Sequence, residues 1–512
     1  MTSLRDLPTS VEGYGPVRAY GDMDPLSWVE LASVRVRPPA LGQAKLLSTI
    51  EAALDACEIR DGSTLSFHHH LRNGDQVLNK VLDACAAKGL KNLTIAASSL
   101  FPVHAPMVNH MRNEVVTRVV TAYMSGPVAD AISAGALRRP VVMQTHGGRA
   151  RAIECGELHI DVAFMAAPTA DDYGNVNGVY GPAACGTLGY AMVDARYADQ
   201  VVVITDHLVP YPACPIDIGQ DLVDFVVAVD SIGDPQGILS GTTRPTTDPV
   251  GLQIAKTAAS VIQHSGLLVE GFSFQTGAGG ISLAVAAEVR HLMQAGRIQG
   301  SFAAGGITGH LCSMLEEGLF RSLFDVQCFD LAAVASYGRN ARHQSMSASL
   351  YANPANRGAV VNRLDAMILG AAEVDLDFNV NVTTGSSGRI LGGSGGHADT
   401  AAGAKLAIVT TRLRASGGPK VVERVRCITT PGASVDAVVT EIGIAVNPRR
   451  SQLAHALESA GLPIVPIDML LTAAGERHPT RMDRSVSPRV VGVVEYRDGS
   501  VIDVIREATP AT

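Results

Sequence analysis

The feature that most constrains the fold of this chain is an internal repeat whose copies lie about two hundred residues apart. Residues 161–177, DVAFMAAPTADDYGNVN, and residues 365–381, DAMILGAAEVDLDFNVN, both begin with Asp, continue through an apolar run and end in Asn-Val-Asn. Two more pairs match in the same order: Ser66-Phe67 with Ser273-Phe274, and residues 195–205 with residues 402–411. Because the offset stays between 204 and 207 residues, the repeat predicts two homologous domains.

The first copy has the pattern of a strand, a helix and a second strand. Residues 62–67 and 93–97 are strand-like, and residues 76–89 between them carry apolar side chains at helical spacing. Gly89 is typical of the residue that follows the end of a helix. Such units form parallel sheets, so we expect an α/β fold with two homologous open-sheet domains.

The domain boundaries follow from the repeat and from the length of the chain. A chain of 512 residues exceeds one ordinary hydrophobic core. Residues 234–249 are rich in turn-forming residues and separate the two copies. We therefore predict an N-terminal extension at 1–40, a first α/β domain at 41–238 and a second at 239–512.

Composition excludes several classes of protein. The formal net charge is −8, and there is no basic stripe, so we expect no nucleic-acid partner. No apolar run reaches the roughly 18 residues of a membrane span, and the first residues lack the apolar region of a signal peptide. The eight cysteines form no CxxC pair, which favours a reduced, cytoplasmic protein.

Several strings between Glu12 and Asp503 jointly carry a family resemblance. They are EGYGP, FHHHLRNGD, NLTIAASSLFPVHAP, HGGRARAIECGELHIDVAF, GFSFQTGAGG, SGGHADTAAGAKL and GIAVNPRR. Together they resemble the alpha subunit of citrate lyase, a citrate CoA-transferase of the CoA-transferase superfamily. The resemblance implies that both α/β domains have the CoA-transferase fold.

The resemblance also implies an activity and partners. The reaction would convert an acetyl-carrier and citrate into a citryl-carrier and acetate, with acetyl-CoA as a substitute substrate. The partners would be the beta (lyase) subunit, which cleaves the citryl thioester, and the gamma (acyl carrier) subunit, in an oligomeric complex. The carrier would supply a CoA-like phosphopantetheine arm, so we expect no tightly bound cofactor.

The glycine-rich loop TGAGG, residues 276–280, lies between a predicted strand and a predicted helix. In such a loop, backbone N–H groups and the helix dipole can stabilise an anion or a developing oxyanion. We expect Gly279 and Gly280 to act in catalysis, and Thr276 and Gly277 to bind substrate. The alternative is an ordinary turn.

A second glycine-rich segment, GGSGGH at 392–397, resembles the segment that closes over the pantetheine arm in CoA-transferases. That resemblance implies that Gly395, Gly396 and His397 contact the substrate. The alternative is tight packing of the helix that follows them against the sheet.

Three consecutive histidines, residues 68–70, end the first predicted strand, and Arg72 follows them. The carboxyl end of a strand is where α/β proteins place their sites, so we expect His69 and Arg72 to bind substrate. Consecutive histidines point to alternating faces, and no Cys or acidic ligand stands at a metal-binding spacing, so we predict no metal site. The alternative is a packed polar loop.

Arg149 and Arg151 are the candidates for binding the carboxylates of citrate, because the guanidinium group matches a carboxylate in shape and charge. The alternative is a surface loop in which they pair with Glu154 or Glu157.

One absence bears on mechanism. Many CoA-transferases use a Glu nucleophile in a GIHxE-like loop, and the corresponding residues here, Gly305 to His310, contain no Glu. Glu316 and Glu317 come later, on a predicted helix. We therefore predict direct attack of citrate on the thioester, through a mixed anhydride and without a covalent Glu intermediate. The alternatives are a Glu-dependent acyl-CoA transferase or hydrolase, and a non-catalytic scaffold subunit.

Overall fold

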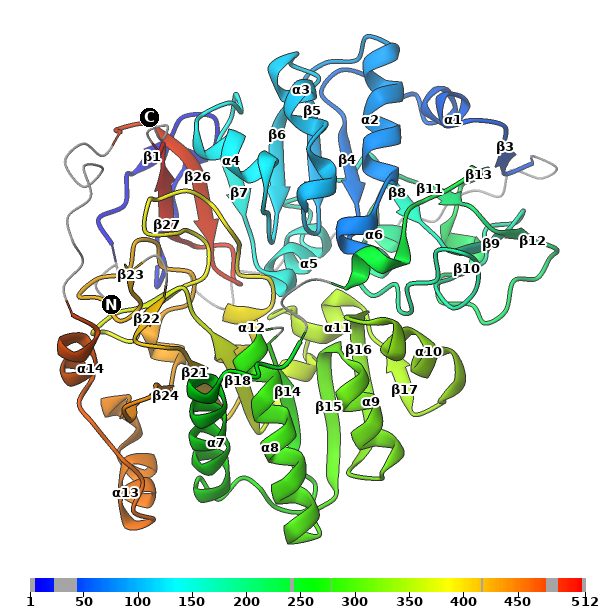
Figure 1. Cartoon of the computed structure of the whole chain (residues 1–512). Helices are drawn as coiled ribbons and strands as arrows, with labels where there is room; N and C mark the ends of the chain where they lie inside the picture. Colours follow the sequence, from blue (N-terminus) through cyan, green and yellow to red (C-terminus); the bar gives the residue numbers. More distant parts are fainter. Residues whose placement is uncertain are drawn as a thin grey trace.

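The computed structural model describes residues 5–22, 44–239, 244–277, 279–415, 418–475 and 487–508. These residues form two large sheets, each flanked by helices, which lie one above the other in Figure 1. The α/β class predicted from the sequence is confirmed. Parts of the predicted N-terminal extension, residues 1–4 and 23–40, and part of the predicted boundary, residues 240–243, lie outside the described residues.

The first large sheet has ten strands within the described residues. Neighbouring strands are parallel except for β27 and β26 at one edge, which are antiparallel. In spatial order the strands are β27 (Val501–Arg506), β26 (Val490–Glu495), β7 (Val141–Met143), β6 (Val116–Thr121), β5 (Leu93–Ala97), β4 (Thr64–Phe67), β8 (Val162–Ala166), β11 (Gln200–Thr205), β13 (Phe225–Ala228) and β3 (Leu46–Leu47).

The second large sheet has eight strands over the same described ranges, parallel except for its last pair. In spatial order they are β17 (His343–Ser345), β16 (Phe320–Cys328), β15 (Gly300–Ile307), β14 (Ser273–Thr276), β18 (Ala366–Gly370), β21 (Leu406–Thr410), β24 (Ala437–Val439) and β25 (Ile444–Val446).

Short sheets of two or three strands accompany the two large ones. Their strands are β1 (Ser10–Val11) with β2 (Gly15–Pro16), β9 (Thr169–Asp171) with β10 (Val176–Asn177) and β12 (Leu208–Val209), β19 (Glu373–Val374) with β20 (Val380–Asn381), and β22 (Arg414–Ala415) with β23 (Gly418–Pro419).

Helices cover the sheets of both halves (Figure 1). Those of the first half are α1 (Ile50–Ala56), α2 (Val77–Ala87), α3 (Met107–Arg112), α4 (Pro127–Ser133), α5 (His146–Glu154) and α6 (Ala191–Tyr197). Those of the second are α7 (Pro249–His264), α8 (Gly280–Gly296), α9 (Gly309–Glu316), α10 (Leu331–Arg339), α11 (Ala348–Ala352), α12 (His397–Gly403), α13 (Ser451–Ser459) and α14 (Ile467–Ala474).

The predicted strand–helix–strand unit is present as β4, α2 and β5. The apolar positions of α2 that define its helical spacing are buried against the sheet: Val77, Leu78, Val81, Leu82 and Cys85. Gly89 has a φ of 77°, and its N–H donates to the carbonyl of Ala86 just beyond the helix. Gly89 thus terminates α2 because a residue with a side chain rarely adopts this conformation.

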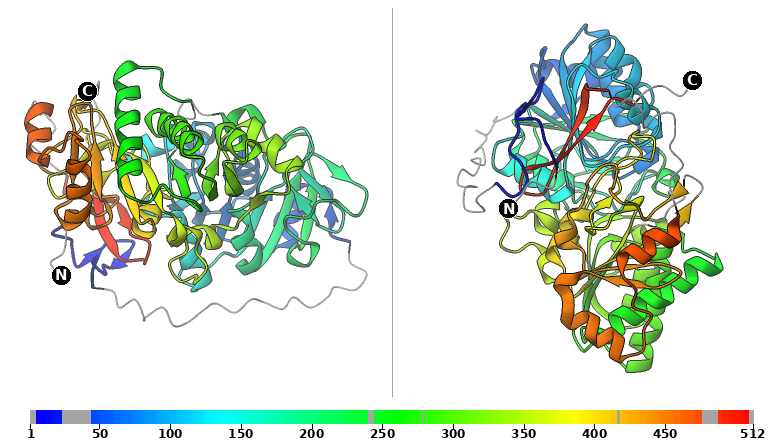
Figure 2. Two further views of the ribbon diagram at one scale, coloured as in Figure 1. Left: turned by 90° about the horizontal axis from the view of Figure 1, so that it is seen from below. Right: turned by 90° about the vertical axis from the view of Figure 1, so that its left-hand side faces the viewer.

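The chain returns to the first half at its C-terminal end. β26 pairs in parallel with β7, and β27 pairs with β26. Figure 2, right, shows these red strands beside the blue first half. The predicted second domain, residues 239–512, included residues 490–506. In the structure these residues belong to the sheet of the first half instead.

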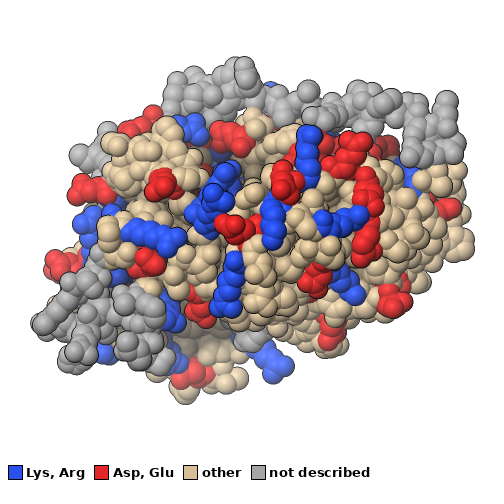
Figure 3. Space-filling view, turned by 90° about the horizontal axis from the view of Figure 1, so that it is seen from above, with Lys and Arg blue, Asp and Glu red and all other residues tan. Residues whose placement is uncertain are grey.

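The surface charge is mixed where Figure 3 displays it. Lys and Arg side chains alternate with Asp and Glu over that face. None of the described helices is long and apolar enough to cross a membrane.

Candidate active site

A cavity of about 410 Å³ between the two halves is lined by histidine, arginine, glutamine and tyrosine side chains. Residues that follow strands of the first sheet line it on one side, among them His69 after β4 and His146 after β7. Thr276 at the end of β14 and Gly370 at the end of β18 line the other. The carboxyl edges of both parallel sheets therefore face one cavity, which is where α/β proteins bind ligands.

Three of the rings that the first half contributes to the cavity lie close together: His69, His146 and Tyr190. The centroids of His69 and Tyr190 are 4.5 Å apart, as are those of His146 and Tyr190, and His69 and His146 are separated by 5.7 Å. Burial lowers the pKa of both histidines, that of His146 to about 3. These two histidine rings are therefore uncharged at neutral pH.

Arg72 is the cation of the cavity. Its side chain lies between two rings, with Cζ 5.5 Å from the centroid of Phe101 and 4.9 Å from that of Phe329. Only 8% of the residue is exposed, and its buried Nε and Nη1 have no hydrogen-bond partner among the described residues. An unpaired buried guanidinium is unfavourable by itself, so the arrangement suits an incoming anion.

The TGAGG loop divides into residues that face the cavity and one that does not. Thr276, Gly277 and Gly279 line it, although the Gly277 N–H already donates to the carbonyl of Ile368 at 2.8 Å. Gly279 is the residue before α8 and has no side chain to accept from the first N–H groups of that helix. Ala278 lies outside the described residues.

Gly280 does not line the cavity. Its carbonyl accepts from the Thr246 N–H at 2.9 Å, and a Cβ placed on it would lie 3.1 Å from the Arg244 carbonyl. Packing thus explains why residue 280 has no side chain, and the expected contact of Gly280 with the thioester stays a prediction.

Backbone hydrogen bonds join the segment 392–396 to the first half. The Gly395 N–H donates to the Ala122 carbonyl at 3.0 Å, and the His146 N–H donates to the Gly395 carbonyl at 2.8 Å. A Cβ on Gly396 would lie 2.3 Å from the Tyr351 hydroxyl, so glycine is required there. Gly395, Gly396 and His397 all line the cavity, as their predicted role demands.

The structure does not bring Arg149 and Arg151 to the cavity. Both are buried on α5, where Arg149 makes two hydrogen bonds to the Asp194 carboxylate, at 2.7 and 2.9 Å. Arg151 donates to Glu157 at 2.7 Å. Burial alone would raise the pKa of Asp194, but Arg149 and His68 beside it lower it overall. These guanidinium groups are committed to internal ion pairs, so they are not free to hold citrate.

No Asp or Glu lines the cavity among the residues that the structure describes. The segment Gly305–His310 forms the end of β15 and the start of α9, and only Gly306 of it reaches the cavity. Glu316 pairs with Arg339 and Glu317 with Arg290, all partly exposed to solvent. Neither glutamate is placed to act as a nucleophile there.

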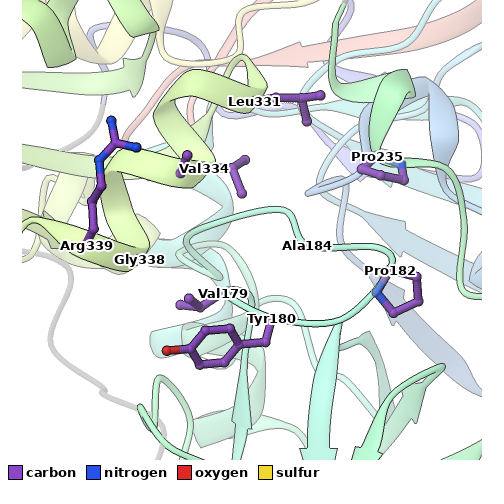
Figure 4. Close-up of a pocket in the computed structure, with 10 residues that line it drawn as sticks. Val179, Tyr180, Pro182, Ala184, Pro235, Leu331, Val334, Gly338 and Arg339 are labelled. Carbon is purple, nitrogen blue, oxygen red and sulfur yellow. The ribbon is translucent and has the colours of Figure 1, made fainter.

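A second depression, of about 430 Å³, lies between residues 179–184 of the first half and α10 of the second. Figure 4 shows Leu331 and Val334 on one side and Tyr180 and Pro182 on the other. Its lining is mainly apolar, and its one charged group, Arg339, is paired with Glu316. This second depression therefore offers no unpaired charged side chain among its described lining residues.

Sequence reasoning missed part of the cavity. His146 is the first residue of the HGGRARAIE string, and its position directly after a strand is a signal for a site residue. The other overlooked lining residues include Tyr190, Gln275, Gln327 and Tyr351. They are separated in sequence and become neighbours only when the two halves meet.

Comparison with known proteins identifies a family. Residues 43–508 match the family described as citrate lyase, alpha subunit (CitF). The chain is 49% identical to the citrate lyase alpha chain of Escherichia coli (strain K12) over 467 residues, 90% of this chain and 91% of that one. It is 47% identical to that of Klebsiella pneumoniae over 469 residues, 91% and 92% of the two chains.

Solved structures are similar to this chain as well, and one of them is of the same family. The alpha subunit of citrate lyase from Streptococcus mutans, solved in complex with citrate, has a TM-score of 0.91 and 48% identity, with 94% of each chain covered. A 4-hydroxybutyrate CoA-transferase from Porphyromonas gingivalis has a TM-score of 0.54 at 17% identity, covering 83% of this chain and 96% of that one, and so shares the fold alone. The chain therefore belongs to the citrate lyase alpha subunit family.

Proposed function

We propose that this chain exchanges acetyl for citryl on the thioester of an acyl carrier, converting acetyl-carrier and citrate into citryl-carrier and acetate. The observation that carries the proposal is a cavity that holds an unpaired buried arginine, Arg72, and no carboxylate among its described lining residues. Such a site attracts an anionic substrate and offers no acidic nucleophile of its own. The solved relative from Streptococcus mutans contains citrate, which agrees with this substrate.

Arg72 is the group that we assign to a citrate carboxylate. Its guanidinium can bind a carboxylate through two parallel hydrogen bonds, which fixes orientation as well as charge. The neutral rings of His69 and Tyr190 leave that charge uncompensated by the protein. The other predicted citrate ligands, Arg149 and Arg151, have no part in this assignment.

The chemistry then needs no nucleophile from the protein. A carboxylate oxygen of citrate attacks the carbonyl carbon of the acetyl thioester, and the C–S bond breaks to release the carrier thiolate. The thiolate attacks the citryl carbonyl of the resulting mixed anhydride and expels acetate. Citrate is already ionised at pH 7, so no general base is required, and catalysis consists of orientation and oxyanion stabilisation.

The thioester arm fits the side contributed by the second half. Gly279 precedes α8, whose first N–H groups carry the positive end of the helix dipole. Gly395 and Gly396 bring the backbone close to the cavity without side chains. The phosphopantetheine arm of a carrier would enter here, so the protein itself needs no resident cofactor.

We further propose a cytoplasmic complex with a beta (lyase) subunit and a gamma (acyl carrier) subunit. A Pseudomonas malonate decarboxylase, which shares this fold at a TM-score of 0.64 and 18% identity over 84% of this chain and 86% of that one, is a hetero-tetramer. That likeness supports only the fold, so the subunits are a proposal from the family.

We also infer that the two halves arose by duplication. In support, β4 and β8 are tied by Thr64 N–H donating to Asp161 at 2.6 Å, and β14 and β18 by Ser273 N–H donating to Asp365 at 2.8 Å. The spatial order β7-β6-β5-β4-β8-β11-β13 in one sheet corresponds to β17-β16-β15-β14-β18-β21-β24 in the other. Superposing 40–230 on 250–445 should align the two aspartates.

The test is kinetic and uses the isolated chain with acetyl-CoA and citrate. Direct attack requires both substrates to be bound together, so initial rates should follow a ternary-complex pattern. In a single turnover with citrate labelled in its carboxylate oxygens, the released acetate should carry one label. Borohydride after incubation with acetyl-CoA alone should leave activity intact.

Each alternative predicts a different outcome. Ping-pong kinetics, with borohydride inactivation at one glutamate, would establish a Glu-dependent transferase. Release of free acetate without citrate would indicate a hydrolase. A folded chain that exchanges nothing would be a scaffold.

A further inference from the structure

The cavity is lined by three histidines in the part of the chain that the structure describes: His69, His146 and His397. They differ in what their ring nitrogens bind. His397 uses both, Nδ1 with the Thr430 hydroxyl at 2.7 Å and Nε2 with the Gly370 carbonyl at 2.9 Å. His69 uses Nδ1 with the Ser98 hydroxyl at 2.6 Å. These two rings are fixed by the protein.

His146 is the exception. Neither of its ring nitrogens has a hydrogen-bond partner within the described residues, and its Nδ1 is buried. The residue is partly exposed. Its ring is held by stacking on His69 and by a tilted contact with Tyr190, and its backbone N–H donates to the Gly395 carbonyl. A histidine that is held firmly but left unpaired in a cavity is a candidate for contact with a ligand.

The position of Gly395 shows which nitrogen of the His146 ring lies toward the glycine-rich segment. A Cβ on Gly395 would lie 3.3 Å from Nε2 of His146, so this nitrogen stands against the glycine-rich segment that lines the cavity. Nδ1 lies on the buried side. Nε2 is thus the nitrogen that a bound thioester would meet between the two halves.

The surroundings keep the imidazole neutral. Burial and then the charge of Arg149 lower the pKa of His146 to about 3. The groups that face it are His69 and Tyr190 in the ring stack, Arg149 on its own helix, and Asp399, which accepts from the N–H of the following residue. The start of a helix also disfavours a cation. A neutral imidazole can carry its proton on Nε2 and donate it in a hydrogen bond.

We propose that His146 is a catalytic hydrogen-bond donor whose Nε2–H binds the thioester carbonyl oxygen and stabilises the oxyanion that forms when citrate attacks. This inference rests on the proposed function. The electron pair of the attacking carboxylate forms the new C–O bond, the carbonyl π pair moves onto the oxygen that His146 contacts, and that pair returns as the C–S bond breaks. The proton stays on His146 throughout.

A purely structural role for His146 would need only its ring. Phenylalanine keeps the ring contacts with His69 and Tyr190 and removes the unpaired Nδ1, so it should be tolerated if packing were the whole function. Loss of one oxyanion donor typically lowers kcat by about 10²–10³. A structural role and a role as hydrogen-bond donor therefore predict different values of kcat for the Phe variant.

The test compares His146→Phe with His146→Gln, whose side-chain amide reaches close to the Nε2 position. We expect the Phe variant to lose roughly a hundredfold in kcat, with KM for citrate changed less than threefold. The Gln variant should recover at least tenfold over it. His159→Gln is the matched control, because His159 is exposed and pairs with Asp199 on the surface.

Thermal unfolding should show that all variants are folded. Should the Phe variant not fold, His146→Leu replaces it in the same comparison with Gln. Retention of more than a third of wild-type kcat by a folded Phe or Leu variant would overturn the role, as would a Gln variant no faster than these. A wild-type chain without acetyl-CoA and citrate exchange would overturn the proposed function, and the inference with it.

Discussion

Replacing Arg72 by methionine should make the ligand-free protein more stable while weakening its use of citrate. The guanidinium is enclosed by Phe101 and Phe329, and its Nε and Nη1 are buried without partners among the described residues. Burial lowers the pKa of this residue, in accord with an environment that opposes its charge. The cation is therefore held at the expense of stability.

The magnitude follows from opposing terms. Removing an uncompensated charge from water is unfavourable by several kcal/mol, and each ring face returns about 1–2 kcal/mol. Methionine at position 72 keeps the apolar stem and gains sulfur–ring contacts of roughly 0.5–1 kcal/mol. We expect the free energy of unfolding without citrate to rise by about 1 kcal/mol. Loss of a two-bond carboxylate contact removes about 3 kcal/mol of binding, or roughly 150-fold in KM for citrate.

Denaturant unfolding with and without citrate, together with initial-rate kinetics, measures both effects. Wild-type protein should be stabilised by citrate, and the Arg72→Met variant should not. Arg72→Lys is the control that keeps the charge but loses the paired geometry, and it should be intermediate. An unchanged KM for citrate, or a loss of more than 2 kcal/mol of stability without any kinetic effect, would show that Arg72 is structural.

Three further outcomes are expected. Gly279→Ala should keep its melting temperature, since the nearest atom to the new methyl is 3.8 Å away, yet lower kcat with acetyl-CoA about tenfold by crowding the thioester. Arg149→Met should lower stability by about 3–5 kcal/mol in denaturant unfolding, because buried Asp194 loses its guanidinium partner and keeps only His68. It should leave KM for citrate unchanged in the folded fraction. Burial raises the pKa of Asp399 to about 6, so its contribution to stability, about 3 kcal/mol, is present below pH 4 and lost as pH rises through 6, and Asp399→Asn should flatten this dependence.

The sequence was sufficient for the elements whose pattern is local. The apolar spacing of α2 and its terminating Gly89 depend only on nearby residues, and both appear as expected. The cavity-facing roles of His69 and Arg72 followed from their position after a strand, because the end of a parallel strand is a fixed place in such folds.

What the sequence could not provide was the pairing of distant residues. Nothing near Arg149 indicates that Asp194, 45 positions later, would bind both of its terminal nitrogens. Gly280 resembles its neighbour Gly279 in sequence, yet it packs against the Arg244 carbonyl, whereas Gly279 faces the cavity. The return of β26 to the first sheet is likewise a long-range pairing that no local pattern signals.

The position of the cavity between the halves follows from the chemistry that we propose for it. If the attacking carboxylate belongs to citrate, the protein must hold two substrates at once instead of presenting a nucleophile of its own. The first half supplies Arg72, His69 and His146, and the second supplies His397 and the glycine-rich backbone before it. Bonds across the interface keep them in register, among them Gln327 Nε2 donating to the His69 carbonyl at 2.7 Å. Because both halves contribute groups to the one cavity, the reacting atoms can meet only where the two sheets face each other.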